Sequence, residues 1–351
     1  MIPRDIKALT GVRFFAALWV VLFHFRDELV LISIGKPFKW LLNLGYLAVP
    51  MFFMLSGFIL SHKYFARYSL KDHAAFIYRR FARLWPVHVA SLLALMVYIG
   101  IIVAHSGHIE SSNYSLQILP LEVAMVRSWF SKDLLWNYPA WSIHAEWFAY
   151  LFVFPIAFWS FRNLSNRLIL LLAIGVLLAG HTFLPIAQFP GKCAEIIFLF
   201  MAGSALYRLR LLLSDFPGTW FATTGLLLFI VAVSGLFNHS ISLIYLAFAL
   251  LILGLSYDGG WLGQFLSQRP VVYGGLISYS MYMTHAVVLK FVGAASHKIG
   301  MQTQGLRIAG AFFFIGAVLM TASAFYHLIE APCNKALRRN SPFGIDLKEQ
   351  D

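Results

Sequence analysis

Long apolar segments separated by short polar ones follow one another along the whole chain. Stretches such as "LILLLAIGVLLAG" and "AFFFIGAVLMTASAF" are continuously apolar, whereas the strands of a transmembrane barrel alternate apolar and polar residues. Because about 20 apolar residues let a helix cross a bilayer, the pattern predicts an all-α, polytopic integral membrane protein with about ten transmembrane helices. The segments expected to span lie near 12–32, 41–61, 86–105, 140–160, 168–186, 193–209, 219–236, 240–256, 273–295 and 307–328.

Composition agrees with this pattern. Of the 351 residues, 60% are hydrophobic and 12% are charged, where soluble proteins average about 25% charged residues. The first apolar run lacks a signal-peptide cleavage site, so we interpret it as the first transmembrane helix. The chain shows no internal repeat or low-complexity tract. We therefore expect residues 1–351 to form a single transmembrane domain without a fused soluble domain.

The net charge of +12 would also suit a nucleic-acid-binding protein, but the distribution of the basic residues indicates a membrane topology. If the N-terminus lies inside, the inner segments hold roughly twice as many Lys and Arg residues as the outer ones. The positive-inside rule then places both termini in the cytoplasm, and we expect no nucleic-acid partner.

Two polar residues of the first apolar segment are candidates for chemistry. Arg13 and His24 are eleven positions apart, which on a helix is three turns plus roughly 20° and about 16.5 Å of rise. They therefore share a face, and one elongated ligand would reach both. The alternative is an arginine that snorkels to the inner interface and a histidine that bonds a neighbour near the outer one.

A basic loop precedes the third apolar segment. Arg79, Arg80 and Arg83 come directly before Trp85 and Pro86. The side chains of Arg79 and Arg83 share a helix face, and paired guanidinium groups suit bidentate binding of phosphate. A role in topology or in binding anionic lipid headgroups is the alternative.

The segment "YPAWSIHAEWFAYLF" places Ser142, Glu146 and Tyr150 at i, i+4 and i+8. This spacing predicts a polar stripe along one helix. Glu146 would lie at a depth similar to that of His24, where a carboxylate can accept from an imidazole N–H and raise its basicity. Pairing with a lysine or a backbone group is the alternative for Glu146.

Two further segments carry buried polar residues. In "SYSMYMTHAVV", Tyr282 and His285 lie on one helix face, and a buried, satisfied histidine is the common explanation for His285. In "HLIEAP", Glu330 lies at the inner end of the last apolar segment, where it would cap the helix or pair with the basic inner loop. The sequence contains no metal-binding motif, and we expect no metal site.

Together these segments resemble the acyltransferase-3 family of integral membrane O-acyltransferases, which modify glycans of bacterial envelopes. The resemblance rests on "LTGVRFFAALWVVLFHF" with its Arg-x10-His motif, "VPMFFMLSGFIL", "RRFARLWP", "WSIHAEWFAY", "LSQRPVVYGGLISYSMYMTH" and "IEAP", which occur in this order. The chain departs from the family pattern at Thr10, where relatives often have Asp, and at Ala149.

The resemblance implies an acyltransferase of the bacterial cytoplasmic (inner) membrane that uses acyl-CoA, usually acetyl-CoA, as co-substrate without a tightly bound cofactor. Arg13, Arg80 and Arg83, with Arg79 nearby, would bind the phosphates of coenzyme A. His24 would be the general base or a transient acyl carrier, and Glu146 would orient it. Ser142, Tyr150, Tyr282, His285 and Glu330 would support the site.

The acceptor remains open at this stage. Outer-side chemistry and the 17% aromatic content suit a polysaccharide, an O-antigen or a lipid-linked oligosaccharide, while a macrolide-type or lipid acceptor and a succinyl donor are alternatives. A secondary transporter of an anionic metabolite would use the same residue types, but would show two matching halves with discontinuous helices. A structural or receptor role leaves His24 without a purpose. The sequence does not indicate an oligomeric state.

Overall fold

The computed structural model describes residues 5–31, 38–106, 114–131, 136–165, 168, 193–213, 217–236, 240–257, 259–299 and 303–343. These residues form helices and turns, with no strand among them. The prediction of an all-α protein is therefore confirmed for the part of the chain that is described. The expected span at 168–186 lies almost wholly outside it.

Two compact units divide the chain, and each is assembled from three separate segments. The first unit comprises Met1–Val20, Leu44–Ser69 and Phe148–Leu276. Its helical elements are α1 (Lys7–His24) up to its last turn, η2 (Gly45–Leu47), α4 (Ala48–Tyr64), the π-helical turn η7 (Ala149–Val153), α9 (Phe154–Asn163), α11 (Cys193–Leu212), α12 (Gly218–Val233), α13 (Ile241–Leu255), α14 (Gly260–Leu266) and α15 (Arg269–Leu276).

The second unit comprises Val21–Asn43, Leu70–Trp147 and Ile277–Asp351. It contains the last turn of α1, then α2 (Arg26–Leu31), α3 (Lys39–Asn43), η3 (Leu70–Asp72), α5 (His73–Ser106), η5 (Leu116–Ile118), α6 (Leu119–Val123), α7 (Arg127–Phe130), η6 (Tyr138–Ala140), α8 (Trp141–Phe148), α16 (Ser278–Ile299), α17 (Gln304–Phe325), the π-helical turn η8 (Tyr326–Glu330) and α18 (Ala331–Arg339).

Long apolar helices are a feature of both units. Within the described residues, four helical segments are long and apolar enough to cross a bilayer, and a bent helix pair would make a fifth. The four are Lys7–His24, Gly45–Tyr64, Leu70–His105 and Gln304–Arg339, and the bent pair is Ile241–Leu255 with Gly260–Leu266. The count of about ten spans and the cytoplasmic location of both termini stay predictions.

Two expected spans have different bounds in the structure. The helix predicted to start at Pro86 begins at His73, and α5 continues through the proline. A proline removes one helical hydrogen bond, and the remaining bonds of a long helix carry it past the interruption. The segment expected at 140–160 is α8 and α9 joined by η7, so the register of its side chains changes where the wider turn begins.

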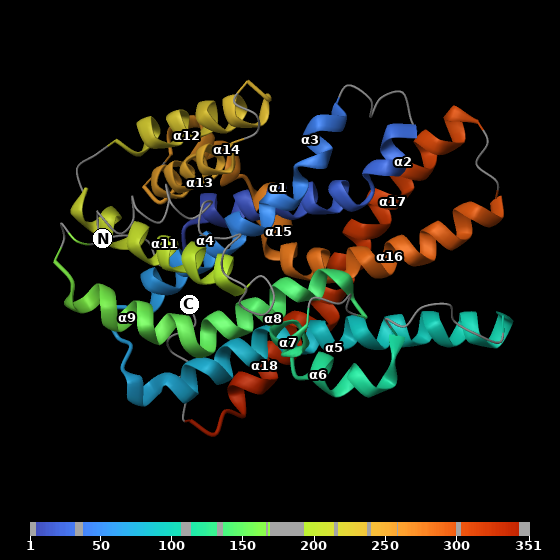
Figure 1. Cartoon of the computed structure of the whole chain (residues 1–351), viewed down its shortest axis with the longest axis horizontal. Helices are drawn as coiled ribbons and strands as arrows, with labels where there is room; N and C mark the ends of the chain where they lie inside the picture. The colour runs from blue at the N-terminus through green and yellow to red at the C-terminus, as the bar shows by residue number, and fades with distance from the viewer. Residues whose placement is uncertain are drawn as a thin grey trace. The chain divides into compact units, whose positions relative to one another are not determined.

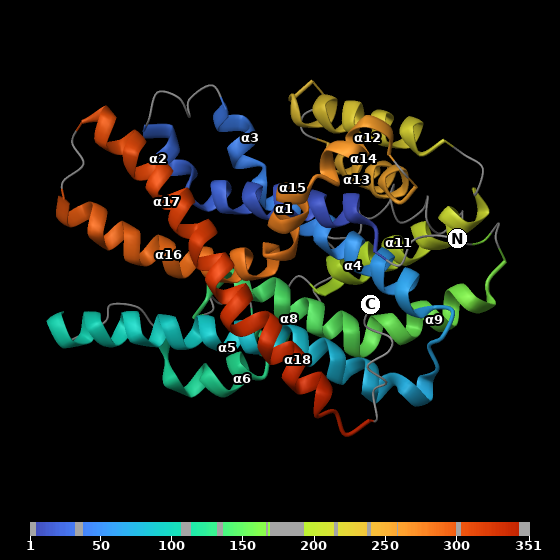
Figure 2. The same cartoon turned by 180° about the vertical axis from the view of Figure 1, so that it is seen from behind.

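Close contact between α4 and α11 holds part of the first unit together, and both views show the two helices side by side (Figures 1 and 2). Gly57 on α4 faces the backbone of Phe200, and Gly203 on α11 faces the backbone of Met54. Small residues at such positions let two helix backbones approach closely, which is the usual way that apolar helices pack in a membrane.

In the second unit, α16 and α17 follow each other as neighbours and α18 packs against α5 (Figures 1 and 2). Hydrogen bonds from tyrosines to backbone carbonyls join these helices. The Tyr78 hydroxyl on α5 donates to the Leu337 carbonyl on α18 at 3.1 Å, and the Tyr279 hydroxyl on α16 donates to the Leu84 carbonyl on α5 at 2.6 Å. These bonds connect the helices that carry the candidate functional residues.

Replacing Gly57 by alanine should destabilise the first unit. The added Cβ would lie 2.0 Å from the Phe200 carbonyl oxygen, which is backbone and cannot rotate away. We expect a loss near the upper end of the range for overpacking, about 3 kcal/mol, seen as a lower unfolding midpoint in detergent. Gly316→Ala on α17 is the control, because nothing lies within 4 Å of its added Cβ. Equal midpoints for the two variants would contradict the close helix contact.

Candidate functional site

Two histidines from distant parts of the sequence meet in the second unit. His24 is the last residue of α1, and His285 lies in the middle of α16. His24 Nδ1 is 3.2 Å from His285 Nε2, and the two ring centroids are 5.0 Å apart. His285 has no exposed surface, while His24 is half-buried. An imidazole pair of this kind can hold and transfer a proton.

The hydrogen-bond partners determine which ring nitrogens carry protons. His285 Nδ1 lies 2.6 Å from the Tyr282 carbonyl oxygen, which can only accept, so Nδ1 carries the hydrogen. Nε2 of a neutral His285 then accepts from Nδ1–H of His24. The lone pair of His24 is consequently on Nε2. The arrangement can make His24 Nε2 a base or a nucleophile.

The ring of Tyr138 also packs against this pair. Tyr138 begins η6, and its ring centroid lies 4.7 Å from that of His24 and 5.9 Å from that of His285. The next residue, Pro139, accepts a hydrogen bond from the Tyr282 hydroxyl at 3.1 Å. The segment before α8 therefore contacts both α16 and the end of α1.

Ser142 and Tyr282, predicted to support the site, lie in contact. The Ser142 hydroxyl donates to the Tyr282 oxygen at 2.8 Å, and both side chains are buried. The Glu146 carboxylate, one turn further along α8, lies within electrostatic range of the Tyr282 hydroxyl. The ring nitrogen that lies against His24 belongs to His285. The sequence had suggested Glu146 as the residue that orients His24, and this role of Glu146 stays a prediction.

Glu330 lies in the turn η8 and is only 6% exposed. The Ser280 hydroxyl on α16 donates to its carboxylate at 2.7 Å, and Thr284 Oγ1 donates to the Ser280 carbonyl at 2.8 Å. Glu330 thereby attaches the end of α17 to the helix that carries His285. The sequence did not indicate Ser280 as the partner of Glu330; the supporting role expected for Glu330 stays a prediction.

Three of the four arginines predicted to bind phosphate, Arg79, Arg80 and Arg83, lie on α5. The helix is continuous over this stretch, so Arg79 and Arg83 do share a face. Arg80 is 7% exposed, and its guanidinium lies 5.8 Å from the ring centroid of Phe76. Arg79 and Arg83 are half-buried. Binding of an anion by these side chains stays a prediction.

Two other residues from the sequence prediction belong to the first unit. Arg13 lies on α1 and is half-buried. Tyr150 lies in η7, and its hydroxyl is 3.4 Å from that of Ser56 on α4. Because Tyr150 follows the start of a π-helical turn, the spacing from Ser142 no longer corresponds to a regular α-helical stripe.

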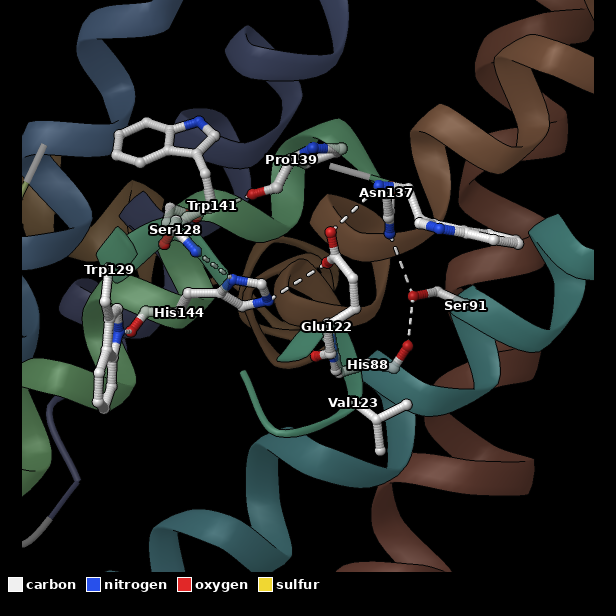
Figure 3. A network of polar contacts seen from close by, with 12 residues as sticks. His88, Ser91, Glu122, Val123, Ser128, Trp129, Asn137, Pro139, Trp141 and His144 are labelled. Atoms are coloured by element: carbon white, nitrogen blue, oxygen red, sulfur yellow. Dashed lines mark hydrogen bonds and ion pairs between the residues drawn. The ribbon is translucent and has the colours of Figure 1, made fainter. Parts of the chain in front are cut away.

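A second group of buried polar residues belongs to the same unit as the histidine pair. We call it the Glu122 cluster: His88, Ser91, Glu122, Asn137 and His144. Figure 3 shows Glu122 between His144 and the segment that contains Asn137. His88 Nε2 donates to the Glu122 carbonyl at 2.7 Å, and His144 Nε2 lies 3.7 Å from Glu122 Oε2. Among the described residues no three His, Cys, Asp or Glu side chains are arranged to hold a metal ion. Hydrogen bonds join the members of the cluster, including the one from Asn137 Nδ2 to Ser91 Oγ.

Asn137 connects the rest of the Glu122 cluster to α16, the helix that carries His285. The amide nitrogen of Asn137 donates to Ser91 Oγ at 3.1 Å (Figure 3). It also donates to the Met283 carbonyl at 2.9 Å. The Trp136 backbone N–H just before it donates to Glu122 Oε1 at 3.4 Å. The backbone on the N-terminal side of Tyr138 is thus attached to both α5 and α16.

Glu122 is fully buried, and burial raises its pKa from 4.5 to about 7. The hydrogen bond from the Trp136 backbone and the charge of Arg127 oppose this rise. Near neutral pH the carboxyl group is consequently balanced between its neutral and its ionised form.

The sequence profile of the family described as acyltransferase domain matches residues 6–327. The chain belongs to the acyltransferase-3 family. Its apolar helices agree with a membrane protein. The family assignment confirms the resemblance found in the sequence motifs, and no solved structure matches the chain.

Two curated relatives of this acyltransferase-3 chain cover parts of it. The protein called acyltransferase MdmB from Streptomyces mycarofaciens is 29% identical over 188 residues, which are 50% of this chain and 46% of that protein. Protein 2 in the picA locus of Rhizobium radiobacter is 34% identical over 99 residues, which are 27% of this chain and 47% of that protein. The matches thus span about half the length of each relative.

Several residues near the histidine pair and in the Glu122 cluster were not indicated by the sequence. Tyr138 is one of 15 tyrosines, and nothing in the spacing distinguishes it. Glu122 and Asn137 lie between the spans expected at 86–105 and 140–160 and belong to none of the recognised motifs. His88 and His144 stand alone on apolar helices. The only signal available was their position beside the recognised motifs "RRFARLWP" and "WSIHAEWFAY".

Ionisation of Glu122 should make the second unit less stable as the pH rises. The pKa of Glu122 is higher in the folded than in the unfolded protein. The resulting stabilisation is therefore fully present below about pH 4.5 and is lost as the pH rises through 7. The shift corresponds to about 3 kcal/mol at most. The unfolding midpoint of the Glu122→Gln variant, measured in detergent from pH 5 to 8, should therefore fall less than that of the unmodified protein.

Comparison of the two curves isolates Glu122. His88, His144 and Arg127, which face or surround the carboxyl group, are present in both proteins. The two proteins therefore differ only at position 122, and the difference between the curves reports the carboxyl group of Glu122. Parallel curves over this range would show that Glu122 does not change its protonation state.

Proposed function

We propose that this protein is an O-acyltransferase that moves an acyl group, most simply acetyl, from acyl-CoA to a hydroxyl group of a cell-envelope glycan. The observation that carries the proposal is the His24–His285 pair, in which the hydrogen bond to the Tyr282 carbonyl leaves a lone pair on His24 Nε2. Membership of the acyltransferase-3 family supports the reaction class.

In this proposal His24 Nε2 takes the proton of the acceptor hydroxyl while the hydroxyl oxygen attacks the thioester carbonyl carbon. A C–O bond forms, the C–S bond breaks, and the proton passes to the coenzyme A sulfur. If His24 instead carries the acyl group, Nε2 forms a C–N bond as the C–S bond breaks and coenzyme A leaves as the thiolate. The acceptor oxygen then forms the C–O bond as the C–N bond breaks, and the released Nε2 takes the hydroxyl proton. The first route requires donor and acceptor together, and the second gives ping-pong kinetics.

His285 assists either route. When His24 becomes positively charged, its Nδ1–H bond to His285 Nε2 strengthens, since a charged donor makes a stronger hydrogen bond than a neutral one. The Tyr282 carbonyl in turn keeps the His285 ring oriented. The carboxylate of Glu146 on α8 would further stabilise positive charge on His24 by electrostatic attraction.

The arginines of α5 would bind the donor. Coenzyme A carries its phosphates at one end of a long arm and the thioester at the other. The guanidinium groups of the buried Arg80 and of Arg79 and Arg83, all on α5, suit phosphate oxygens. In the proposed topology the protein crosses the inner membrane of a bacterium several times. These arginines face the cytoplasm, and His24 lies toward the outer side.

The acceptor class follows from that topology. A hydroxyl presented from the outer side fits a growing polysaccharide, an O-antigen or its lipid-linked precursor. The competing function is transport of an anionic metabolite, and it predicts uptake of a solute into liposomes without consumption of thioester. Turnover of radiolabelled acetyl-CoA by the purified protein, with label recovered in the glycan, is the result that the acyltransferase proposal requires.

Replacing His24 by alanine should lower acyl transfer by about 10²–10⁴-fold, because general-base catalysis contributes roughly this much. The assay follows the transfer of radiolabel from acetyl-CoA to the acceptor at saturating donor. His105→Ala is the matched control, since His105 is an exposed histidine at the end of α5 that bonds its own helix. Transfer by His24→Ala at the rate of the control would refute the proposed role.

Replacing Arg83 or Arg80 by alanine should raise the KM for acyl-CoA by about tenfold each, because a charge-assisted hydrogen bond to a phosphate is lost. Steady-state kinetics with varied acyl-CoA give this value. Arg339→Ala, an exposed arginine in the last turn of α18, is the control for a general effect of positive charge. An unchanged KM in the α5 variants would leave these arginines as determinants of topology.

A further inference from the structure

The Tyr138 hydroxyl has an unusual environment. Its oxygen is buried, and it has no hydrogen-bond partner among the described residues. A buried hydroxyl without a partner costs about 1–3 kcal/mol, and in native proteins such groups are few and call for an explanation. A hydroxyl of this kind beside a catalytic centre is able to bind a ligand atom that is present only during the reaction.

The position of Tyr138 points to that centre. Its ring packs against His24 with the centroids 4.7 Å apart and against His285 at 5.9 Å. The reacting acyl carbon must approach His24 in both routes described above, so it must also come close to Tyr138. Sequence spacing had not indicated this residue.

The backbone around Tyr138 is held on both sides. Asn137 before it donates hydrogen bonds to α5 and α16, and the Pro139 carbonyl after it accepts one from the Tyr282 hydroxyl. The Ala140 N–H also donates to the Asn137 carbonyl at 2.8 Å, which closes the turn η6. A donor held in this way does not have to be reoriented when charge develops next to it, and such preorganisation is what makes an oxyanion site effective.

We propose that the Tyr138 hydroxyl donates a hydrogen bond to the carbonyl oxygen of the acyl group during transfer. As the new bond to the acyl carbon forms, the C=O electron pair moves onto this oxygen, and Tyr138 stabilises the resulting negative charge. The C=O bond re-forms when the C–S bond breaks, and Tyr138 keeps its own proton throughout. The inference rests on the proposed acyl transfer, but it holds for both the base and the acyl-histidine route.

The protonation state of Tyr138 agrees with a role as a donor. Burial raises the pKa of this tyrosine above its usual range, and the neighbouring Tyr282 acts in the same direction. The hydroxyl therefore keeps its hydrogen at any physiological pH. Asn137 acts through the placement of Tyr138 and is a positioning residue in this scheme.

The kinetic test uses Tyr138→Phe, which removes one oxygen and preserves the ring. We expect kcat to fall about 10²–10³-fold, the usual cost of removing one oxyanion donor, with an unchanged KM for acyl-CoA. Tyr98→Phe is the matched control, because Tyr98 is a half-buried tyrosine of α5 that packs on Phe291. A kcat for Tyr138→Phe equal to that of the control would overturn the proposal and leave the hydroxyl to a bound water.

A second measurement separates this inference from the proposed function. Infrared spectra of acetyl-CoA with a ¹³C-labelled carbonyl, bound to the full-length His24→Ala variant, should show a carbonyl band at lower frequency than in water-free solvent. The band should shift back when Tyr138→Phe is added. Binding without this difference would overturn the role of Tyr138 while the acyltransferase proposal stands. Absence of both acetyl-CoA binding and turnover in the unmodified protein would overturn the proposed function and the role of Tyr138 with it.

Discussion

The Tyr282 carbonyl accepts a hydrogen bond from the buried ring of His285, and the proton positions of the whole site follow from this contact. His285 has no exposed surface, so water cannot replace that bond, and one ring nitrogen must remain the donor. The other nitrogen is left as an acceptor toward His24. A side chain at the end of one helix thereby acquires a defined basic nitrogen because a backbone carbonyl of another helix lies 2.6 Å from its partner.

The short segment from Trp136 to Ser142 links two buried polar systems. Its first half is attached to the Glu122 cluster, and its second half is attached to Tyr282. Tyr138 lies between these attachments. In an apolar bundle, polar groups gain stability only from one another, and a segment held at several such points is a rigid support for catalytic side chains. Rigidity of this kind matters because small displacements of a catalytic group reduce rates strongly.

Much of the helical organisation was predictable from the chain. The continuous helix from Arg13 to His24 and the shared face of Arg79 and Arg83 agree with the spacing of these residues. Local periodicity contains this information because the rise and rotation per residue of an α-helix are nearly constant. Where the rotation changes, as in the π-helical turn that contains Tyr150, the side chains do not form the regular stripe that was predicted.

Partners across the fold were not predictable in the same way. Spacing placed His285 on a polar helix face but could not indicate that its ring meets His24, 261 positions away. Glu122 lies outside the expected spans, yet it is fully buried and contacts His144 and the Trp136 backbone.

The amino-acid sequence by itself determined the all-α class, the family and the residue types of the site, because apolar run length, helical periodicity and motif order are local properties of a chain. Only the tertiary structure decided which polar groups pair, which histidine nitrogen holds the lone pair and why Tyr138 lies beside it. Those features depend on contacts between segments far apart in sequence, where burial removes water and each polar atom takes whichever partner the packing brings within about 3 Å.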